Sequence, residues 1–375
     1  MAARLLSMVS HFEELEDPRV ERTRLHSLVD VICLAICAVI AGAEGWEDIE
    51  EFGRQKEAWL RRHLRLENGI PSHDTISRVF RMLKPQVFDA AFRAWVQLLT
   101  ERLGLSQIAV DGKTLRRSHD RGSMKSTLHL VCAWSVENHL VLGQQAVDDK
   151  SNEITAIPEL LRLLELKGAI VTIDAMGCQT EIAEQIAAAG GDYVLAVKDN
   201  QPTLHAAVQK CFEQHHESGR KGRGQHAKTN EKGHGRRDER HYYHLPIPDD
   251  LSWIKDAWRG ARSLGQAISY TTRDGQITSE VRYYLSSLAP NARRLATAVR
   301  NHWGIENSLH WVLDMSFDED QCRIRKDHGP ANFALLRRIA INLIKQDTSR
   351  GSIRKKRKRA AWNDDELLTI LTTAG

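Results

Sequence analysis

The feature that most constrains the fold of this chain is the alternation of strand and helix patterns between residues 107 and 197. Three β-rich runs come first, and Glu137-Asn138 separates the second from the third as a hairpin turn would. A helical pattern, an apolar strand, a second helical pattern and a last strand follow. The order β-β-β-α-β-α-β predicts an α/β fold, with a mixed sheet flanked by helices.

Two carboxylates occupy corresponding places in this pattern. Asp111 comes directly after the apolar run at 107–110, and Asp174 comes directly after the one at 169–173. In open α/β sheets, the crevice beyond the carboxyl ends of the strands is the usual ligand site. A third acid, Glu306, shares one helical face with residues at three- and four-residue spacing, namely Trp303, Asn307, His310 and Asp314. Each acid alone is most simply a solvated carboxylate, but together they can converge at one end of the sheet.

Three converging carboxylates suit hard divalent cations such as Mg²⁺, which prefer carboxylate oxygens and waters. Two such ions, roughly 3.5–4 Å apart, stabilise the attacking and the leaving oxygen of an in-line phosphoryl transfer. Asp111, on the central strand, suits a bridging role, and Asp174 and Glu306 would each anchor one ion. This chemistry requires no Ser-His or Cys-His nucleophile.

The net charge of +4, from 53 Lys and Arg against 49 Asp and Glu, is unevenly distributed. Residues 219–240 have a balance of +5, and residues 350–359 hold seven basic residues and no acid. The two stretches carry +12, so the rest of the chain carries −8. Localised positive charge attracts phosphate backbones independently of sequence. A solvated loop and tail is the plain alternative.

The first hundred residues have helical patterns, at 25–43 and 46–64, followed by a helix that begins near Ser72. This last helix has one apolar stripe and one polar, basic face. Its outline is that of a helix-turn-helix, with an ordinary helical hairpin as the alternative. Residues 201–291 are partly β in character, with a strong hairpin signal at Asp274-Gly275.

Several features argue against a membrane or secreted protein. The longest uncharged apolar run, 31–43, has 13 residues, fewer than the roughly 20 that span a bilayer. The N-terminal stretch has no apolar core of signal-peptide length. The six cysteines include no CxxC pair and fit buried thiols of a reducing compartment. We therefore expect a cytoplasmic protein.

At these residues the sequence resembles a known family, the DDE transposases of bacterial insertion sequences, and within it the H-repeat-associated group. The resemblance covers nearly the whole chain in order and spacing, through the segments LEDPR, HSLVDVICLAICAVIAGAEGWEDIEEF, PSHDTISRVFRML, IAVDGKTLR, VTIDAMGCQ, GGDYVLAVKDNQ and HWGIENSLHWVLDMSFDEDQCRIRKDHGPANFALLRRIAINLIK.

The resemblance implies a ribonuclease-H-like catalytic domain over residues 101–348, with a β-rich insertion at about 201–291. A helical N-terminal domain over 1–100 precedes it, and a basic C-terminal tail over 349–375 follows. By resemblance, Asp111, Asp174 and Glu306 are the catalytic acids and the ligands of two Mg²⁺ ions, for which Mn²⁺ is a substitute.

A related branch of these transposases carries a Tyr, Arg and Lys signature around the catalytic Glu. Here Val299, His302 and Leu313 stand at the corresponding offsets, so those roles are not carried over. Other residues are the candidates for phosphate contacts: Lys113, Arg300, Asn307, His310, Arg323 and Arg325.

The leading hypothesis is a metal-dependent transposase that cuts and joins double-stranded DNA at terminal inverted repeats and inserts it into target DNA. It would act as a homodimer or higher assembly in a synaptic complex, in association with the bacterial nucleoid. Two alternatives stay open: a decayed transposase that only binds DNA, and a nuclease of the same fold that does not join strands.

Overall fold

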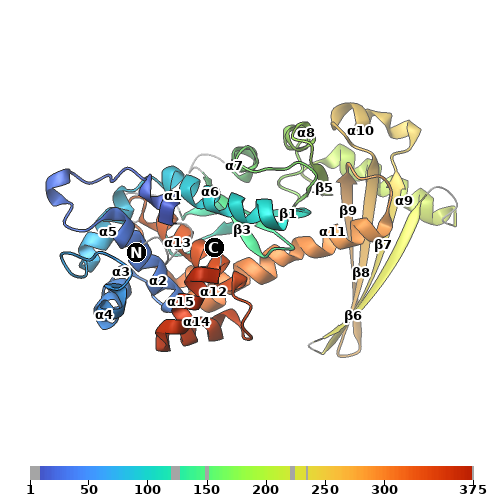
Figure 1. Ribbon diagram of the computed structural model, residues 1–375. Coiled ribbons are helices and arrows are strands. Elements are labelled where there is room, and N and C mark those ends of the chain that lie inside the picture. Colours follow the sequence, from blue (N-terminus) through green and yellow to red (C-terminus); the bar gives the residue numbers. More distant parts are fainter. Residues whose placement is uncertain (1–8, 120–126, 148–151, 220–223, 234, 374–375) are drawn as a thin grey trace. The chain divides into compact units, whose positions relative to one another are not determined.

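The computed structural model describes residues 9–119, 127–147, 152–219, 224–233 and 235–373 (Figure 1). The chain divides into two compact units. The first unit comprises Met1–Gly104, Gly112–Lys150 and Glu306–Gly375, and the second unit comprises Leu105–Asp111 and Ser151–Ile305. Two long elements are divided between the units. Strand β1 (Gln107–Thr114) is divided after Asp111, and the helical stretch that begins at Ala292 is divided before Glu306.

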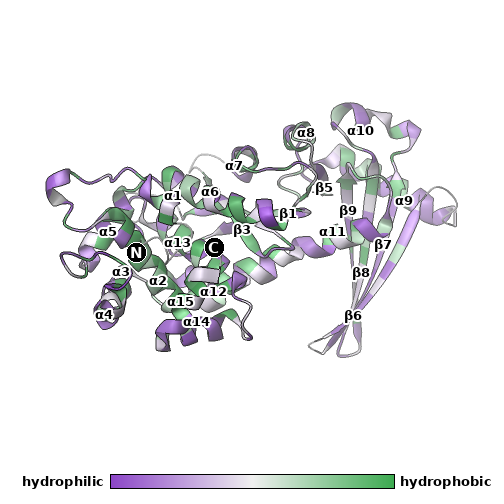
Figure 2. Cartoon of the chain, viewed as in Figure 1, coloured by the Kyte–Doolittle hydropathy of each residue, from purple (hydrophilic) through white to green (hydrophobic). Residues whose placement is uncertain are grey.

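The first unit is built mainly of helices around two buried ones, α2 (Leu28–Ala41) and α13 (Gly329–Gln346). Every residue from Val31 to Ile40 is buried, which is expected for a helix that is apolar all round. Figure 2 shows the hydrophobic colouring of α2. The other α-helices of this unit are α1 (Val9–Glu13), α3 (Trp46–Gln55), α4 (Glu57–Leu60), α5 (His73–Met82), α6 (Pro85–Leu103), α12 (Trp311–Phe317), α14 (Ile353–Trp362) and α15 (Asp364–Thr373).

Length and composition of the described helices allow one test for membrane spans. No single helix among them is long and apolar enough to cross a membrane. Helices α2 and α3 together have the necessary length and apolar composition, but the chain bends by 92° between them.

The expected helix at 46–64 is in fact interrupted at Lys56, where the backbone leaves helical geometry between α3 and α4.

Helix α5 begins as the sequence predicts. The Ser72 hydroxyl accepts a hydrogen bond from the Thr75 backbone N–H, and the predicted apolar stripe, Ile76, Val79, Phe80 and Leu83, is buried. The segment that separates α4 from α5 covers residues 61–72, which is longer than the 3–4-residue turn of a helix-turn-helix. DNA binding by this region stays a prediction.

Strands β2 (His129–Ser135) and β3 (Leu140–Val147) form the predicted hairpin, and the sheet order in the first unit is β3-β2-β1. Helix α13 packs against β3. The Asn342 amide accepts a hydrogen bond from Val141 N and donates one to Val141 O, at 2.8 and 2.9 Å. This side chain therefore satisfies a backbone position on the outer strand, which would otherwise lose its hydrogen bonds.

Residues 353–373 are not a solvated tail, because they fold into α14 and α15. Lys356 and Arg357 are buried, and their cations bond to the last carbonyls of two other helices. The Lys356 ammonium donates to Ile344 O and Asp347 O at the end of α13, and Arg357 donates to Val39 O near the end of α2. Helix carboxyl ends lack internal donors and favour positive charge, so part of the basic run is structural.

The second unit is a mixed sheet in the order β1-β4-β5-β9-β8-β7-β6. β1, β4 (Ile170–Ile173) and β5 (Asp192–Val197) are parallel, and the following strands are antiparallel: β9 (Gln276–Ser286), β8 (Ser263–Arg273), β7 (Arg236–Pro246) and β6 (Gln225–Gly233). Its α-helices are α7 (Glu153–Leu161), α8 (Thr180–Ala188), α9 (Pro202–Glu217), α10 (Ser252–Ala257) and α11 (Ala292–Ile305). The predicted α/β class, with helices beside a mixed sheet and a β-rich insertion, is confirmed.

The insertion is more regular than expected. Asp274 and Gly275 have φ of +49° and +78°, the left-handed geometry of the predicted tight hairpin turn between β8 and β9. The basic stretch, expected as a loop, is instead a second hairpin, β6 and β7, because its backbone pairs in register from Gln225 to Gly233. Residues 220–223 and 234 of that stretch lie outside the described part.

Candidate functional site

Asp111 and Asp174 occupy neighbouring backbone positions just beyond the paired residues of two parallel strands. The register of β1 and β4 ends with Val110 opposite Ile173, and each aspartate is the next residue along the chain. Neighbouring strands are about 4.8 Å apart, so the two carboxylates start from adjacent backbone positions. Within the second unit, the backbone positions of the two aspartates are therefore neighbours, while their role as catalytic acids stays a prediction.

Asp111 differs from its prediction in one respect, because it lies inside β1 and does not follow the strand. The strand continues to Thr114 since its later residues belong to the pairing with β2, and Leu115 N donates to Leu128 O just beyond it. Asp111 is thus the first residue of β1 after its register with β4 ends, in a strand that also neighbours β2.

The Asp174 carboxylate is oriented by the turn that follows it. Its Oδ1 accepts hydrogen bonds from Met176 N (3.1 Å) and Gly177 N (3.5 Å). A Cβ atom at Gly177 would lie 2.3 Å from Ile173 Cγ2, so this tight turn needs a glycine. Burial, and then the Glu153 carboxylate, raise the pKa of Asp174, against the opposing effects of the two backbone donors and Lys198. A partly buried, acid-rich position of this kind favours a bound cation.

Helix α11 covers the sheet face beside these aspartates. The Gln107 amide donates to Ala298 O (2.8 Å) and to Thr172 Oγ1 (3.3 Å), and His302 Nδ1 lies 3.0 Å from the same hydroxyl. Burial lowers the pKa of His302 to about 4, so the imidazole is neutral at pH 7. In the sequence, His302 is only a departure from the signature of the related branch, and no spacing signal points to its contact with β4.

Glu306 begins a π-helical turn, Glu306–His310, which joins the end of α11 to α12. Such turns are rare and are frequent at functional sites. A π-turn advances less per residue than an α-helix, and the shared face of Trp303, Glu306, Asn307, His310 and Asp314 stays a prediction. Glu306 and Asn307 are exposed, and His310 is half-buried.

The convergence of all three acids stays a prediction. Asp111 and Asp174 belong to the second unit and Glu306 to the first. In the part of the chain that the structure describes, no group of three or more His, Cys, Asp or Glu residues has an arrangement that could hold a metal ion.

The candidate phosphate contacts have different surroundings. The Lys113 ammonium is buried and lies 2.6 and 2.8 Å from the two Asp314 carboxylate oxygens. Arg300 makes a two-pronged ion pair with Glu231, at 2.9 and 3.0 Å. Arg325 donates to Arg117 O, and Arg323 is exposed. Lys113 and Arg300 thus already have carboxylate partners, which a phosphate would have to displace.

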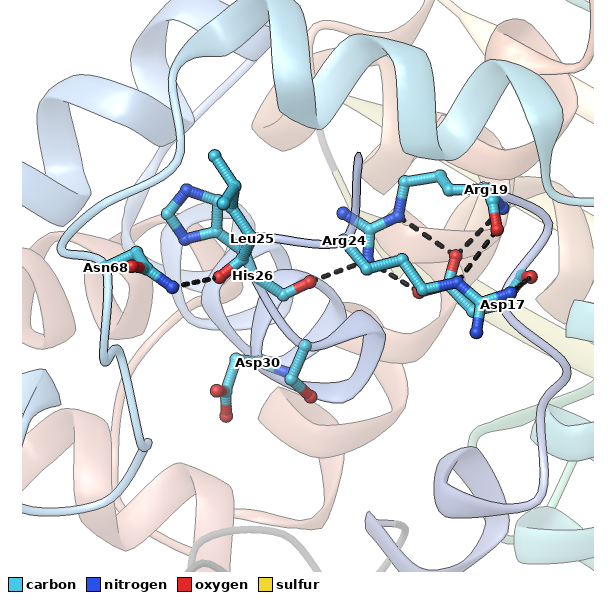
Figure 3. Close-up of polar contacts among 8 residues, drawn as sticks. Asp17, Arg19, Arg24, Leu25, His26, Asp30 and Asn68 are labelled. Carbon is cyan, nitrogen blue, oxygen red and sulfur yellow. Dashed lines mark hydrogen bonds and ion pairs between the residues drawn. The ribbon is translucent and has the colours of Figure 1, made fainter. Parts of the chain in front are cut away.

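A polar cavity of about 270 Å³ in the first unit was not anticipated. Figure 3 shows the contacts beside this cavity. The Arg19 guanidinium donates hydrogen bonds to the Asp17 carboxylate and to His26 O, and the Asn68 amide donates one to Leu25 O. The Asp30 carboxylate lines the cavity and accepts from the backbone of Arg65 and Leu66, and burial raises its pKa. The LEDPR motif therefore stabilises the segment that leads into α2, through the hydrogen bonds of Arg19.

Comparison with known proteins identifies the family to which the chain belongs. A family model described as the transposase DDE domain matches residues 102–343, and one described as DDE_Tnp_1-associated matches residues 9–96. The chain is 40% identical to the "H repeat-associated putative transposase YhhI" of Escherichia coli (strain K12), over 99% of each chain. It is 40% identical to the "Putative transposase YncI" of Escherichia coli O157:H7, over 98% of this chain and 95% of that one.

A third relative is the "Uncharacterized protein in dhlA 3'region" of Xanthobacter autotrophicus, 46% identical over 76% of this chain and 96% of that one. These matches confirm the resemblance drawn from the motifs. The chain belongs to the DDE transposase family, among its H-repeat-associated members.

Proposed function

We propose that this transposase-family chain cleaves DNA at the ends of an insertion sequence and joins those ends to target DNA, with Asp111, Asp174 and Glu306 as its metal-ligating acids. The observation that carries the proposal is the adjacency of Asp111 and Asp174, each directly after the last paired residue of the parallel strands β1 and β4. Family membership adds the expectation of a third acid on the helix after the insertion.

The side chains present suit a hard divalent cation. Carboxylate oxygens are the ligands that Mg²⁺ prefers, and Mn²⁺ accepts the same set. The Asp174 carboxyl is partly buried near the Glu153 carboxylate, so positive charge there would relieve both burial and repulsion. Two Mg²⁺ ions, when bound, supply positive charge that stabilises the attacking and leaving oxygens of an in-line phosphoryl transfer.

Each acid has a distinct role in this proposal. Asp111 follows the last β1 residue in register with β4, next to the backbone position of Asp174, which suits a carboxylate shared by both ions. Asp174 is oriented through Oδ1 by two backbone donors. Glu306 follows His302 by four residues, and His302 bonds to Thr172, two residues before Asp174. The end of α11 is thereby directed along β4 toward its carboxyl end.

The partner is double-stranded DNA carrying terminal inverted repeats, together with a target duplex. Synapsis of two ends would require at least two copies of the chain. Activity on chromosomal DNA would place the protein in the cytoplasm, at the nucleoid.

The test is an incubation of the full chain with terminal-repeat DNA and Mg²⁺, scored for nicked and strand-transferred products. We expect both products, loss of both with EDTA, and their loss in Asp111→Asn, Asp174→Asn and Glu306→Gln. The exposed acid Asp256 provides a matched control, Asp256→Asn, which should retain both products. Cleavage by folded Asp111→Asn or Glu306→Gln protein would overturn the assignment of the acids, and nicking without joining would identify a nuclease.

A further inference from the structure

The far ends of β6–β9 carry an arrangement of charge that the sheet itself disfavours. In the register of β6 and β7, Lys232 lies directly opposite Arg237. In the register of β7 and β8, Arg236 lies directly opposite Arg273. Like charges in directly opposed positions of an antiparallel pair destabilise it. The two pairs occupy consecutive positions of β7, and a bound anion would offset the repulsion in both of them.

The two pairs lie on opposite faces of the sheet. Arg236 and Arg237 are consecutive residues of β7, so their side chains leave from opposite faces, and each takes its cross-strand partner with it. All four side chains are exposed. Figure 2 shows the hydrophilic colouring of β6 and β7.

Both faces are open to a partner at this end. The first six residues of β9, Gln276 to Val281, are all exposed, whereas a strand with one covered face would alternate. The acids of the protein neutralise the positive charge at this end only in part. Asp238 is shared between Arg236 and Arg240, at 3.1 and 3.0 Å. Lys232, Arg236, Arg237, Thr272 and Asp274 line one open, shallow surface at this end.

We propose that this tip, defined by Lys232, Arg236, Arg237 and Arg273, enters the major groove of duplex DNA, with one cationic pair toward each wall of phosphates. The inference rests on the proposed function, which makes DNA the partner. Stacked sheets pack about 10 Å apart, which is the room that one sheet occupies with its packed side chains, and the major groove is about 12 Å wide and admits a two-stranded β-ribbon such as β6 and β7. Gly233, Gly235 and Gly275 at the two turns let the backbone approach the groove floor.

The first test measures affinity for a 30-base-pair duplex by fluorescence anisotropy over a salt series, with the full chain and no divalent metal. Replacing one pair, in Lys232→Gln/Arg237→Gln or in Arg236→Gln/Arg273→Gln, should reduce the slope of log affinity against log salt by about 1.8, since each phosphate contact contributes about 0.9. The variant with all four changes should lose about twice that. Lys210→Gln/Lys255→Gln removes the same charge from exposed sites on α9 and α10 and should leave the slope unchanged.

Thermal unfolding keeps the result interpretable. Lys232→Gln/Arg237→Gln should unfold at the wild-type temperature or above it, because it removes a like-charge repulsion. Arg236→Gln/Arg273→Gln removes a repulsion and also one of the two partners of Asp238, so its unfolding temperature should stay near that of wild type. An equal slope loss in the Lys210/Lys255 control, or unchanged slopes in folded tip variants, would overturn the tip as a DNA contact. A change of oligomeric mass without a change of DNA affinity would make the tip a protein interface instead.

The second test addresses the groove. Guanine N7 faces the major groove, so bound wild-type protein should protect a stretch of N7 atoms from dimethyl sulfate, and the four-residue variant should not. The same protection in both proteins would overturn groove entry. Wild-type chain that binds no duplex at all would overturn the proposed function as well, whereas binding that ignores the tip variants would overturn this inference alone.

Discussion

The Lys113 ammonium and the Asp314 carboxylate form a two-pronged ion pair, with N–O distances of 2.6 and 2.8 Å, inside the first unit. Lys113 is two residues after Asp111 in the chain, and Asp314 is eight residues after Glu306. A second acid, Asp320, lies 3.6 Å from the same ammonium. Burial raises the pKa of Asp314 although Lys113 opposes that shift. The pair therefore tethers the end of β1 to α12.

Breaking this tether should destabilise the first unit. Lys113→Met leaves a partly buried carboxylate without its cation, and we expect a loss of about 1–3 kcal/mol in the free energy of unfolding, less than for a fully buried pair. Urea denaturation of the full chain measures the loss. The double variant Lys113→Met/Asp314→Leu should recover most of it, and a double variant as unstable as the sum of the single ones would show that the two residues are not coupled.

His302 should contribute a pH dependence of stability. Its pKa is about 4 in the folded chain, against 6.5 unfolded, so the unfolded state binds more protons between these values. This stability is complete above pH 6.5 and is lost as the pH falls toward 4, by about 3 kcal/mol in total. His302→Gln keeps a polar partner for Thr172 and does not titrate, so its unfolding free energy should fall less over this range. Parallel pH profiles for the two proteins would contradict the assignment.

Replacement of Asp174 should separate stability from metal binding. Without divalent cations, Asp174→Asn should be at least as stable as wild type, because it removes a charge that burial and Glu153 disfavour. Added Mg²⁺ at ten times its Kd should stabilise wild type by about 1.4 kcal/mol and leave Asp174→Asn unchanged. Thermal unfolding with and without Mg²⁺ measures both effects. Equal stabilisation of the two proteins would remove Asp174 from the ligand set.

The basic run of α14 should divide into structural and exposed cations. Lys356→Met removes the donor at the end of α13 and the ion pair with Asp347, at 3.2 Å, and should cost about 2 kcal/mol of stability. The exposed residues Arg354, Lys355 and Lys358 can all be changed to Gln with an effect within about 0.5 kcal/mol. Guanidinium denaturation compares the two variants. Equal losses of stability in the two variants would mean that the buried Lys356 contributes no more to stability than the exposed cations do.

Much of the sheet could be predicted because its signals are local. The run at 169–173 is apolar throughout and short, which is typical of a strand buried on both faces, and it is observed as β4. Asp274-Gly275 requires left-handed backbone geometry, which few other dipeptides accept. The N-cap at Ser72 depends only on residues within one helical turn.

The elements that could not be predicted depend on distant partners. Nothing near Asp111 states that β1 continues, because its extension is fixed by pairing with β2. Lys356 and Arg357 have the composition of a solvated tail, and only the carbonyls of Ile344 and Val39 give them structural roles. The meeting of Glu306 with the two aspartates likewise depends on the arrangement of segments far apart in the sequence, and it stays a prediction.

The π-turn at Glu306–His310 has a consequence for sequence change in this region. A π-turn accommodates one residue more than an α-helical turn over the same span, as a single-residue insertion would. Deleting one residue there would restore regular pitch and leave α12 in nearly its present phase. A turn that relaxed to α-helical pitch without losing a residue would instead rotate everything after it by about 100° about the helix axis relative to Glu306. Asp314 would then leave Lys113, and the buried face of α12 would turn toward solvent. The ion pair between Lys113 and Asp314 therefore helps to hold the π-turn in place.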